Sequence, residues 1–513
     1  MLRNALFALA GFTALAAAPL TLQAQDVPAR QLTASQEALA KAIRSEARGR
    51  IEDFYARRGY WPLWLEDGRL TPAADAFLAH VDSARIDGLR PRDYDPEDLR
   101  QLIRDAEHGE VDAMAKAEVR LSRSFARFVA EMQRPSREMT YYDDAARPSA
   151  MREDEVLRRA ALAPDFPRFV QTMGWMSPYY AGLREALAVG SGQGIPTTIV
   201  QNGPLLRHGD RGLRVMQLRR RLGLEEGDLF DDALGDALRA FQKERSLTAD
   251  GVLGPQTVAR LNSRPRGLNT ALLRTNLDRA RTLPGPWTKH IVVNAAEARL
   301  SYFDEGERQG AMNVVVGTPD TPTPMMAGML SYATLNPYWN VPVSLVKKTI
   351  APAVLRGISL DDMGYEVMSD WTADARKVDY KSVDWKGAAA GTTELRVREL
   401  PGKGNAMGSV KFMFPNDQGI YLHDTDNHSL FAKADRQFSN GCVRLENASE
   451  LGAWLFDSRM PRPDSDAPEQ HIALPTPVPV YITYLTAVPE GDGTIAVFDD
   501  VYGRDPGTRL AAR

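Results

Sequence analysis

The chain contains one cysteine, Cys442, and a histidine, His423, precedes it by 19 residues. A cysteine attacks as its thiolate, which a nearby base or electropositive surroundings generate. His423 falls in an expected strand, whereas His428 falls in a polar loop, and rigid placement favours His423 as the base. Either histidine, taken alone, is also compatible with a residue that has no role. Together with the thiol, they indicate Cys–His chemistry of the acyl-transfer kind.

The residues around the thiol indicate a tight turn that exposes it. Ser439, Asn440 and Gly441 precede Cys442, and the glycine permits a close approach of a substrate backbone. Backbone N–H groups in such a turn can point at a developing oxyanion. Arg444 follows two residues after the thiol, so in an extended chain both side chains face the same way. Arg444 then either binds a carboxylate and favours the thiolate, or forms an ordinary salt bridge.

A cysteine count of one excludes an intrachain disulfide and a multi-thiolate metal site. The N-terminus, MLRNALFALAGFTALAAAPLTLQAQD, has the layout of a secretory signal peptide over residues 1–24, with an uncleaved membrane anchor as the alternative. A lone thiol in an exported protein suggests a reactive group or an intermolecular bridge. The remaining interpretation is a buried cysteine with a purely structural role.

The length and the net charge limit the number of domains and the kinds of partner that we expect. A chain of 513 residues suggests roughly three domains. The net charge of −4 argues against a general polyanion binder, so no nucleic-acid partner is expected. No second long apolar segment follows the N-terminal one, and no stable membrane span is expected after signal cleavage.

Periodicity divides the chain into helical and strand-rich parts. From about residue 30 to 190, apolar residues recur at helical spacing, and the Gly-rich stretch 189–203 reads as a boundary. Residues 204–262 predict three short helices, the last opened by Pro255. From His290 onward, short β-rich runs alternate with turns, interrupted by an irregular region at about 353–405.

Here the sequence resembles a known family. His423 followed by Ser439-Asn440-Gly441-Cys442-Val443-Arg444 is similar to the signature of the YkuD-type L,D-transpeptidases. The runs Tyr421–Thr425 and Asn336–Pro342 resemble its large, YcbB-type branch. The 204–262 unit resembles the peptidoglycan-binding domain 1 type, through Gly209–Gly212, Ala240-Phe241-Gln242 and Asp250–Gly254.

The resemblance implies a multidomain α+β protein. Its mainly β YkuD-type catalytic domain carries helical insertions and follows a helical scaffold and a small three-helix peptidoglycan-binding module. The expected order is a signal peptide at 1–24, the scaffold at 25–200, the module at 204–265, a linker at 266–288, the catalytic domain at 289–487 with a capping insertion at about 353–405, and a C-terminal strand and tail at 488–513.

The family's activity then suggests roles for individual residues. Cys442 is the expected nucleophile and His423 the general base, acting on tetrapeptide stems of peptidoglycan in the periplasm. The expected oxyanion and substrate-binding residues are Gly441, Tyr421, Ser439, Asn440, Arg444 and Trp339. No metal or organic cofactor is expected, and other cell-wall enzymes are candidate partners.

Several alternatives stay open at this point. The same fold also suits an L,D-carboxypeptidase or endopeptidase, or an enzyme that attaches a protein to peptidoglycan. A noncatalytic wall-binding protein would keep Cys442 as a structural thiol. Many family members carry a histidine where this chain has Asn440, and what orients His423 is left undetermined, because Asp424 should face the other way.

Overall fold

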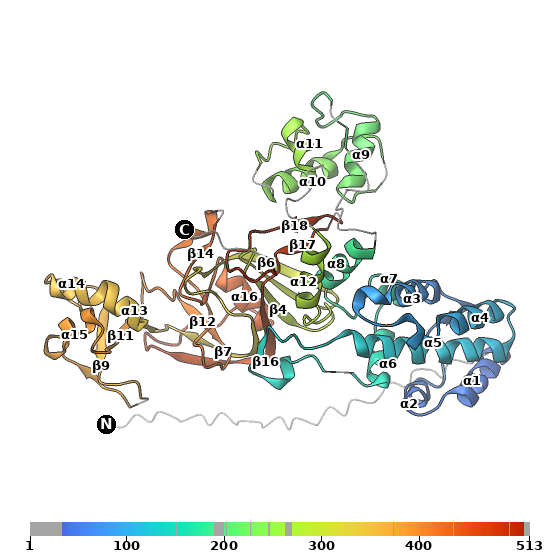
Figure 1. Ribbon diagram of the computed structural model, residues 1–513, viewed down its shortest axis with the longest axis horizontal. Coiled ribbons are helices and arrows are strands. Elements are labelled where there is room, and N and C mark those ends of the chain that lie inside the picture. The colour runs from blue at the N-terminus through green and yellow to red at the C-terminus, as the bar shows by residue number, and fades with distance from the viewer. Residues whose placement is uncertain are drawn as a thin grey trace, which may run out of the picture.

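A computed structural model describes residues 33–506, except 150, 189–199, 202, 226, 245–246, 262–268, 373, 434 and 492. The expected signal peptide lies outside the described residues. Figure 1 shows a helical domain at one end, a central β domain, a small lobe at the other end and a three-helix module to one side. Among the described residues, no helix is both long and apolar enough to cross a bilayer.

The N-terminal part is helical, as the periodicity predicted. Its helices are α1 (Ala34–Glu46), α2 (Arg50–Arg57), α3 (Ala73–Asp82), α4 (Pro96–Glu107), α5 (Val111–Met132), α6 (Glu153–Ala161), α7 (Phe166–Gln171) and α8 (Pro178–Ala188). Two very short strands, β1 (Leu65–Glu66) and β2 (Arg69–Leu70), form a hairpin. Thr33 and Gln36 form a capping box that begins α1. The long α5 buries one apolar face in the middle of this domain.

The three-helix module has its own apolar core. Its helices are α9 (Leu213–Arg221), α10 (Asp232–Glu244) and α11 (Pro255–Leu261), and α11 begins at Pro255 as expected. Val215, Leu218, Leu234 and Leu238 are fully buried in an apolar cluster of their own, whose described members run from Val200 to Leu261. Figure 1 shows the module beside β17 and β18, apart from the main body.

The β domain is a sheet that closes on itself. Its strands are β4 (His290–Asn294), β5 (Arg299–Asp304), β6 (Glu307–Gly317), β7 (Met326–Leu335), β12 (Val410–Met413), β13 (Leu422–His423), β14 (Gln437–Ser439), β15 (Val443–Leu445) and β16 (Gln470–Thr483). The order runs β12-β13-β15-β6-β5-β4-β16-β7, and β7 also pairs with β12, which completes a ring. Helix α16 (Ala448–Leu455) follows β15.

The two faces of this sheet have different neighbours. One face buries Leu300, Val314, Phe412, Leu422 and Val443 in a single apolar cluster. The opposite face, through Val292, Phe303 and Tyr481, joins the core of the helical domain. The short strand β3 (Thr140–Tyr141) leaves the helical domain and pairs in parallel with β7. The helical domain and the β domain are therefore held together by a common apolar core and by the pairing of β3 with β7.

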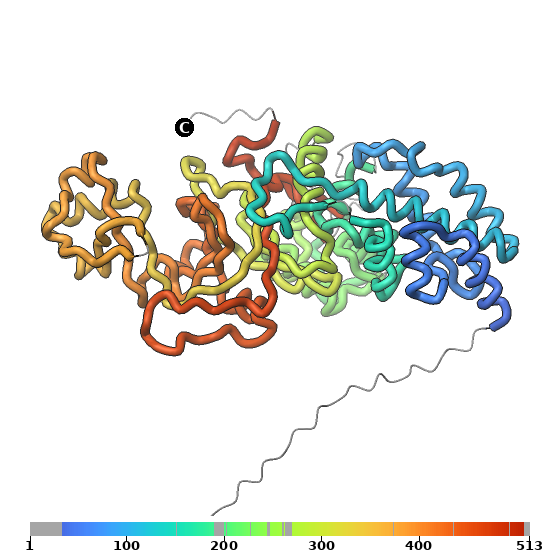
Figure 2. The backbone as a smooth tube through the Cα atoms, turned by 90° about the horizontal axis from the view of Figure 1, so that it is seen from below, coloured from blue at the N-terminus to red at the C-terminus, as the bar shows by residue number. Residues whose placement is uncertain are grey.

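A small lobe is inserted between β7 and β12. It contains β8 (Trp339–Asn340), α13 (Val343–Leu345), a π-helical turn at Val346–Ile350, α14 (Ala351–Leu355), β9 (Tyr365–Met368), β10 (Lys377–Val378), α15 (Trp385–Ala390) and β11 (Arg396–Glu399). We expected this insertion to begin at about 353. It begins earlier in the structure, because Val341, Val346 and Ile350 belong to the same core as Leu360 and Val397. Figure 2 shows the lobe well separated from the helical domain.

Two segments are more ordered than the sequence indicated. The sequence predicts a linker at 266–288, but α12 (Thr270–Ala280) occupies much of it, capped by Asn269 and buried through Leu273 and Leu277. The C-terminal stretch forms a hairpin of β17 (Ala487–Pro489) and β18 (Ile495–Val497). Tyr502 and Arg504 then make hydrogen bonds back to the β domain.

Candidate active site

Four of the residues singled out in the sequence lie in or directly before a ladder of two strands. Strands β13 and β15 are parallel, with Leu422 opposite Val443 and His423 opposite Arg444. Leu422 and Val443 point into the apolar core. Because side chains alternate along a strand, His423 and Arg444 point away from that core. Tyr421 and Cys442 directly precede the two strands; the Tyr421 phenol contacts the thiol, and Cys442 is also packed against the edge of the apolar core. From strand spacing and rise, His423 and Cys442 are diagonal neighbours about 8 Å apart at Cα.

A network of hydrogen bonds shapes the turn that carries the thiol. Ser439 is buried, and its Oγ donates to the carbonyl of Cys442 at 2.6 Å and accepts from the N–H of Gly441 at 3.1 Å. Gly441 has φ +114°, a region that favours glycine. Asn440 is exposed at the tip of this turn. The N–H of Gly441 is bonded to Ser439, whereas the N–H of Cys442 makes no hydrogen bond to the described residues and is a candidate oxyanion donor.

His423 is buried and held by a backbone group. Its Nδ1 lies 2.6 Å from the carbonyl oxygen of Asp424, so Nδ1 carries the proton and Nε2 has a free lone pair. Burial, followed by the charges of Arg444 and Lys411, lowers the pKa of His423 to about 3. The imidazole is therefore neutral near pH 7, the form that accepts a proton.

The thiol of Cys442 is half-buried and lies beside Tyr421. Burial raises its pKa, while the backbone N–H and phenol of Tyr421 and the charge of Arg444 oppose that rise by stabilising the thiolate. Sγ donates to the carbonyl of Gly419 at 3.5 Å rather than to His423. Catalytic hydrogen bonds are often long in an unliganded enzyme and tighten when substrate binds. The Tyr421 and His423 rings lie 5.7 Å apart between centroids.

Two cations flank the imidazole, and they differ in their pairing. Lys411 is opposite His423 on β12, and its Nζ is bound by Glu469 at 2.9 and 3.2 Å. Arg444, on the other side, forms no ion pair among the described residues, and its Nε is buried without a hydrogen-bond partner. An orphaned buried donor is costly unless a ligand satisfies it. Arg444 therefore presents an unneutralised positive charge beside the thiol.

The other expected site residue lies elsewhere. Trp339 is in β8, pairs with Glu399 of β11 and packs against the core of the small lobe. Within the described part of the chain, no group of three or more His, Cys, Asp or Glu side chains is arranged to hold a metal ion.

Comparison with known domain families identifies the domain that contains this candidate site. The model of the "L,D-transpeptidase catalytic domain" matches residues 288–478, which include Tyr421, His423, Cys442 and Arg444. The chain carries a YkuD-type L,D-transpeptidase catalytic domain. Residues 49–187 match a "Scaffold domain" model, and residues 215–261 match a "Putative peptidoglycan binding domain" model. The YkuD domain thus follows a scaffold and a peptidoglycan-binding module in chain order.

Relatives are similar over part of their length. A Haemophilus influenzae protein named "Putative L,D-transpeptidase" is 30% identical over 249 residues, which is 47% of this chain and 50% of that protein. The match therefore spans half of the relative. Among solved structures, an L,D-transpeptidase from Mycobacterium smegmatis is 14% identical over 38% of this chain and 58% of its own, with a TM-score of 0.19. One from Xylanimonas cellulosilytica is 17% identical over 55% of this chain and 99% of its own, also with a TM-score of 0.19.

Some residues around the candidate site were not foreseen. Lys411 interrupts the apolar run Val410–Phe414, and a lone charge in a strand was the signal that it faces a polar site. The carbonyl of Asp424 orients His423, and a backbone acceptor leaves no side-chain signal in a sequence. Thr323 donates to the carbonyl of Gly441 at 2.8 Å from a loop more than 100 residues away in the chain.

Proposed function

We propose that this protein is a periplasmic L,D-transpeptidase that crosslinks peptidoglycan through a thioester at Cys442. The observation that carries the proposal is that Tyr421, His423, Cys442 and Arg444 lie together at the paired strands β13 and β15 of the YkuD domain. A thiol, a neutral imidazole and an unpaired guanidinium on one surface suit acyl transfer from a peptide that carries a carboxylate.

In the first half-reaction, His423 Nε2 takes the proton of the Cys442 thiol, and Sγ attacks the carbonyl carbon of meso-diaminopimelate at the third position of a tetrapeptide stem. The carbonyl oxygen becomes an oxyanion that accepts from the N–H of Cys442 and from the Tyr421 phenol. As the C–N bond breaks, the imidazolium returns the proton to the leaving amine. D-Alanine departs, and a thioester remains on Cys442.

The second half-reaction repeats the proton transfers with a new nucleophile. The neutral imidazole removes a proton from the side-chain amine of a second stem as that amine attacks the thioester carbonyl. The C–S bond breaks, the thiol is restored, and an amide joins the two stems. His423 accepts one proton and returns one in each half-reaction, so the imidazole is neutral again before the next step.

Arg444 is the proposed binding group for a carboxylate of the donor tetrapeptide. A stem ending in diaminopimelate and D-alanine carries free carboxylates close to the scissile bond. A guanidinium with no partner of its own gains a charge-assisted hydrogen bond when such a group binds. Ser439 holds the turn, while Asn440 at its exposed tip and Trp339 near the small lobe are candidates for contacts farther along the stem.

The rest of the chain also supports a function in the bacterial cell wall. The module at 215–261 matches a peptidoglycan-binding family, so peptidoglycan is the proposed partner, together with enzymes that trim stems to tetrapeptides. The signal-peptide-like N-terminus supports export to the periplasm. No cofactor enters the proposed steps.

The test is incubation of the purified protein with disaccharide-tetrapeptides, with products read by mass spectrometry. Crosslinked dimers formed with loss of D-alanine support the proposal. Tripeptides without dimers would identify water as the acceptor and contradict transpeptidation. Cys442→Ala should abolish both products, and Ser458→Ala, which removes an exposed hydroxyl hydrogen-bonded within its own loop, is the matched control. A carbapenem should also add its mass to the wild type and not to Cys442→Ala.

A further inference from the structure

Residues far away in the chain hold the turn that carries Cys442 through hydrogen bonds to its backbone. We propose that Thr323 and the segment 500–505, here called the C-terminal hook, position the nucleophile for acylation. This inference rests on the proposed role of Cys442 and adds positioning residues to it. Neither Thr323 nor the hook touches the reacting atoms.

Thr323 is the direct link to the turn. It is fully buried, and its Oγ1 donates to the carbonyl of Gly441 at 2.8 Å while accepting from the N–H of Gly317 at 2.8 Å. One hydroxyl thus ties the residue before Cys442 to the end of β6. The same loop makes a second attachment, because the N–H of Thr318 donates to the carbonyl of Ser439 at 3.0 Å.

The hook in turn holds the loop that contains Thr323. The Tyr502 phenol donates to the carbonyl of Gly317 at 2.6 Å, and Nη2 of Arg504 donates to the carbonyl of Thr323 at 2.9 Å. The two sides of the Thr323 loop are therefore fixed by two hook residues. The Arg504 guanidinium also lies over the rings of Tyr502 and Tyr484, 4.9 and 5.1 Å from their centroids.

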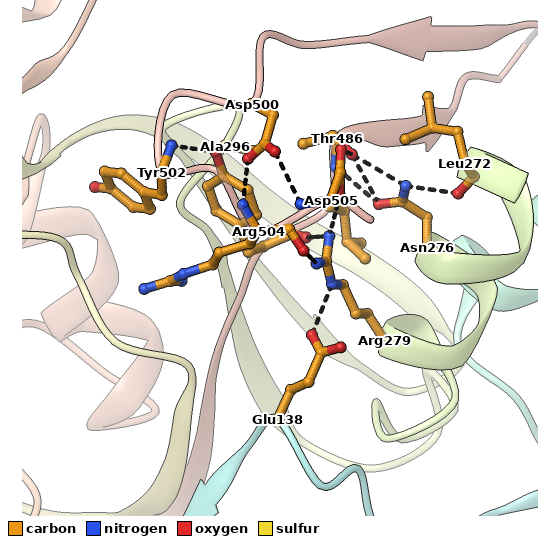
Figure 3. Close-up of polar contacts among 12 residues, drawn as sticks. Glu138, Leu272, Asn276, Arg279, Ala296, Thr486, Asp500, Tyr502, Arg504 and Asp505 are labelled. Carbon is orange, nitrogen blue, oxygen red and sulfur yellow. Dashed lines mark hydrogen bonds and ion pairs between the residues drawn. The ribbon is translucent and has the colours of Figure 1, made fainter. Parts of the chain in front are cut away.

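Figure 3 shows how the hook is anchored. Asp500 accepts from the N–H groups of Arg504 and Asp505, both at 2.8 Å, which closes the segment on itself. Arg279 of α12 donates to the Asp505 carboxylate at 2.6 Å and to the Arg504 carbonyl at 2.6 Å. Its Nε also donates to Glu138, at 3.0 Å, in the segment that leaves the helical domain.

The Arg279 guanidinium is almost fully buried, with 1% of its side chain exposed. A buried charge with several satisfied donors fixes a geometry, because any displacement leaves donors unpaired. The anchored hook can therefore hold Gly317 and Thr323 in one position. Those residues in turn fix the carbonyl of Gly441 and the direction of Sγ. Small errors in such placement are costly, since a misplacement of about 1 Å can slow a reaction by about a hundredfold.

The test compares three variants of Thr323 and Tyr502 with two matched controls. Thr323→Val removes the hydroxyl at nearly constant volume, and Thr323→Ser keeps it. Tyr502→Phe removes only the phenol oxygen. The matched controls are Thr483→Val, which removes a buried hydroxyl without a partner, and Tyr302→Phe, which removes a phenol bonded to Glu450 in the same domain. The readouts are the acylation rate constant and KM for tetrapeptide, together with iodoacetamide labelling of the lone thiol.

We expect Thr323→Val and Tyr502→Phe to lower the acylation rate constant by about tenfold to a hundredfold, with KM changed less than about twofold. Thr323→Ser should recover most of the rate, and the two controls should match the wild type. Iodoacetamide should label Cys442 faster in Thr323→Val, because a loosened turn exposes the half-buried thiol. Thermal unfolding midpoints close to that of the wild type would separate these effects from unfolding.

Wild-type rates of both acylation and labelling in Thr323→Val and Tyr502→Phe would overturn the proposal. A loss in Thr323→Val that Thr323→Ser shares would also overturn it, because the hydroxyl would not be the cause. If the wild type does not react with tetrapeptide at all, the proposed function fails. The labelling comparison still decides whether the hook fixes the thiol.

Discussion

His423 and Arg444 face each other across the parallel strands β13 and β15, so the imidazole has a guanidinium as its neighbour where many catalytic histidines have a carboxylate. A nearby carboxylate stabilises the imidazolium, whereas a nearby cation opposes it. The group that orients His423 is instead the neutral carbonyl of Asp424. The pair therefore favours a histidine that is neutral near pH 7, the state required of the proposed base.

The pH dependence of acylation should follow the thiol and not the histidine. The pKa of His423 is lowered to about 3, so its protonation does not limit activity above about pH 5. Burial raises the pKa of Cys442, so thiolate becomes more available as the pH rises. We expect kcat/KM for acylation to increase from pH 6 to pH 9 without an inflection near pH 6.5. An acid limb centred near 6.5 would contradict this account of His423.

Replacement of His423 should remove the base without removing the thiol. His423→Asn is expected to lower kcat by about a hundredfold to ten-thousandfold, the usual contribution of a positioned general base. His428→Asn is the matched control, because His428 is exposed in the neighbouring 3₁₀ turn. Rates of crosslinking measured at saturating donor provide the comparison. Equal losses in the two variants would show that His423 has no special role.

The proposed carboxylate site can be tested with a modified donor. Arg444→Met should lower kcat/KM for the tetrapeptide by about tenfold to a hundredfold, because a charge-assisted hydrogen bond is lost. A donor with an amidated diaminopimelate carboxylate should lose a similar factor with the wild type and little with Arg444→Met. If amidation weakens both proteins equally, Arg444 does not bind that carboxylate.

Arg444→Met should also change the titration of His423. The guanidinium is one of the charges that lower the pKa of this histidine, although burial is the larger cause. We therefore expect the pKa of His423 to rise in the variant, as measured by NMR of the imidazole. An unchanged titration would mean that the two groups are not electrostatically coupled.

Gly441→Ala should disturb the geometry of the turn more than the stability of the fold. Gly441 has φ +114°, and an added Cβ would lie 3.1 Å from Cδ1 of Ile420, so alanine is strained there by about 1–2 kcal/mol. We expect crosslinking to fall by at least tenfold and the thermal midpoint to change by a few degrees. Gly491→Ala, at an open position, is the control and should behave as the wild type. Full activity of Gly441→Ala would show that the turn geometry is not needed.

Lowering the pH should destabilise the fold before most carboxylates become protonated. Burial lowers the pKa of His80 and of His290 to about 4, and that of His423 to about 3. These groups bind protons more readily when unfolded, so the stability they contribute is complete above about pH 6.5 and is lost as the pH falls toward 4. Each of His80 and His290 contributes up to about 3 kcal/mol to this loss.

The measurement is the thermal midpoint between pH 7 and pH 4. Burial raises the pKa of Glu118, which acts in the opposite direction and reduces the slope. His290→Phe should flatten the profile, because it removes a buried titrating ring that stacks on Phe303. A profile identical to that of the wild type would contradict the assignment.

The sequence predicted the site through residues that are close together in the chain. Ser439, Gly441, Cys442 and Arg444 belong to one short segment, and His423 belongs to a strand whose apolar neighbour, Leu422, marks the buried face. Alternation along a strand then fixes which side chains point together. The helical N-terminal part and the mainly β catalytic part were predicted for the same reason, because local periodicity determines them.

Contacts between distant segments could not be read in the same way. Thr323, Lys411 and Tyr502 reach the site by strand pairing and by the fold of the C-terminal segment, and no local pattern reports such pairing. The helix α12 was missed because Gly- and Pro-containing flanks made 266–288 resemble a linker. The free N–H of Cys442 became evident only when Ser439 was seen to occupy the N–H of Gly441.

The central claim is that Cys442 itself receives the acyl group from diaminopimelate. Its most direct test is the intact mass of the protein after brief mixing with a disaccharide-tetrapeptide, combined with measurement of free D-alanine. We predict a covalent adduct equal to the donor minus D-alanine, located on the peptide that contains Cys442, with one D-alanine released for each adduct. D-Alanine release without dependence on Cys442, or an adduct on another residue, would contradict the account.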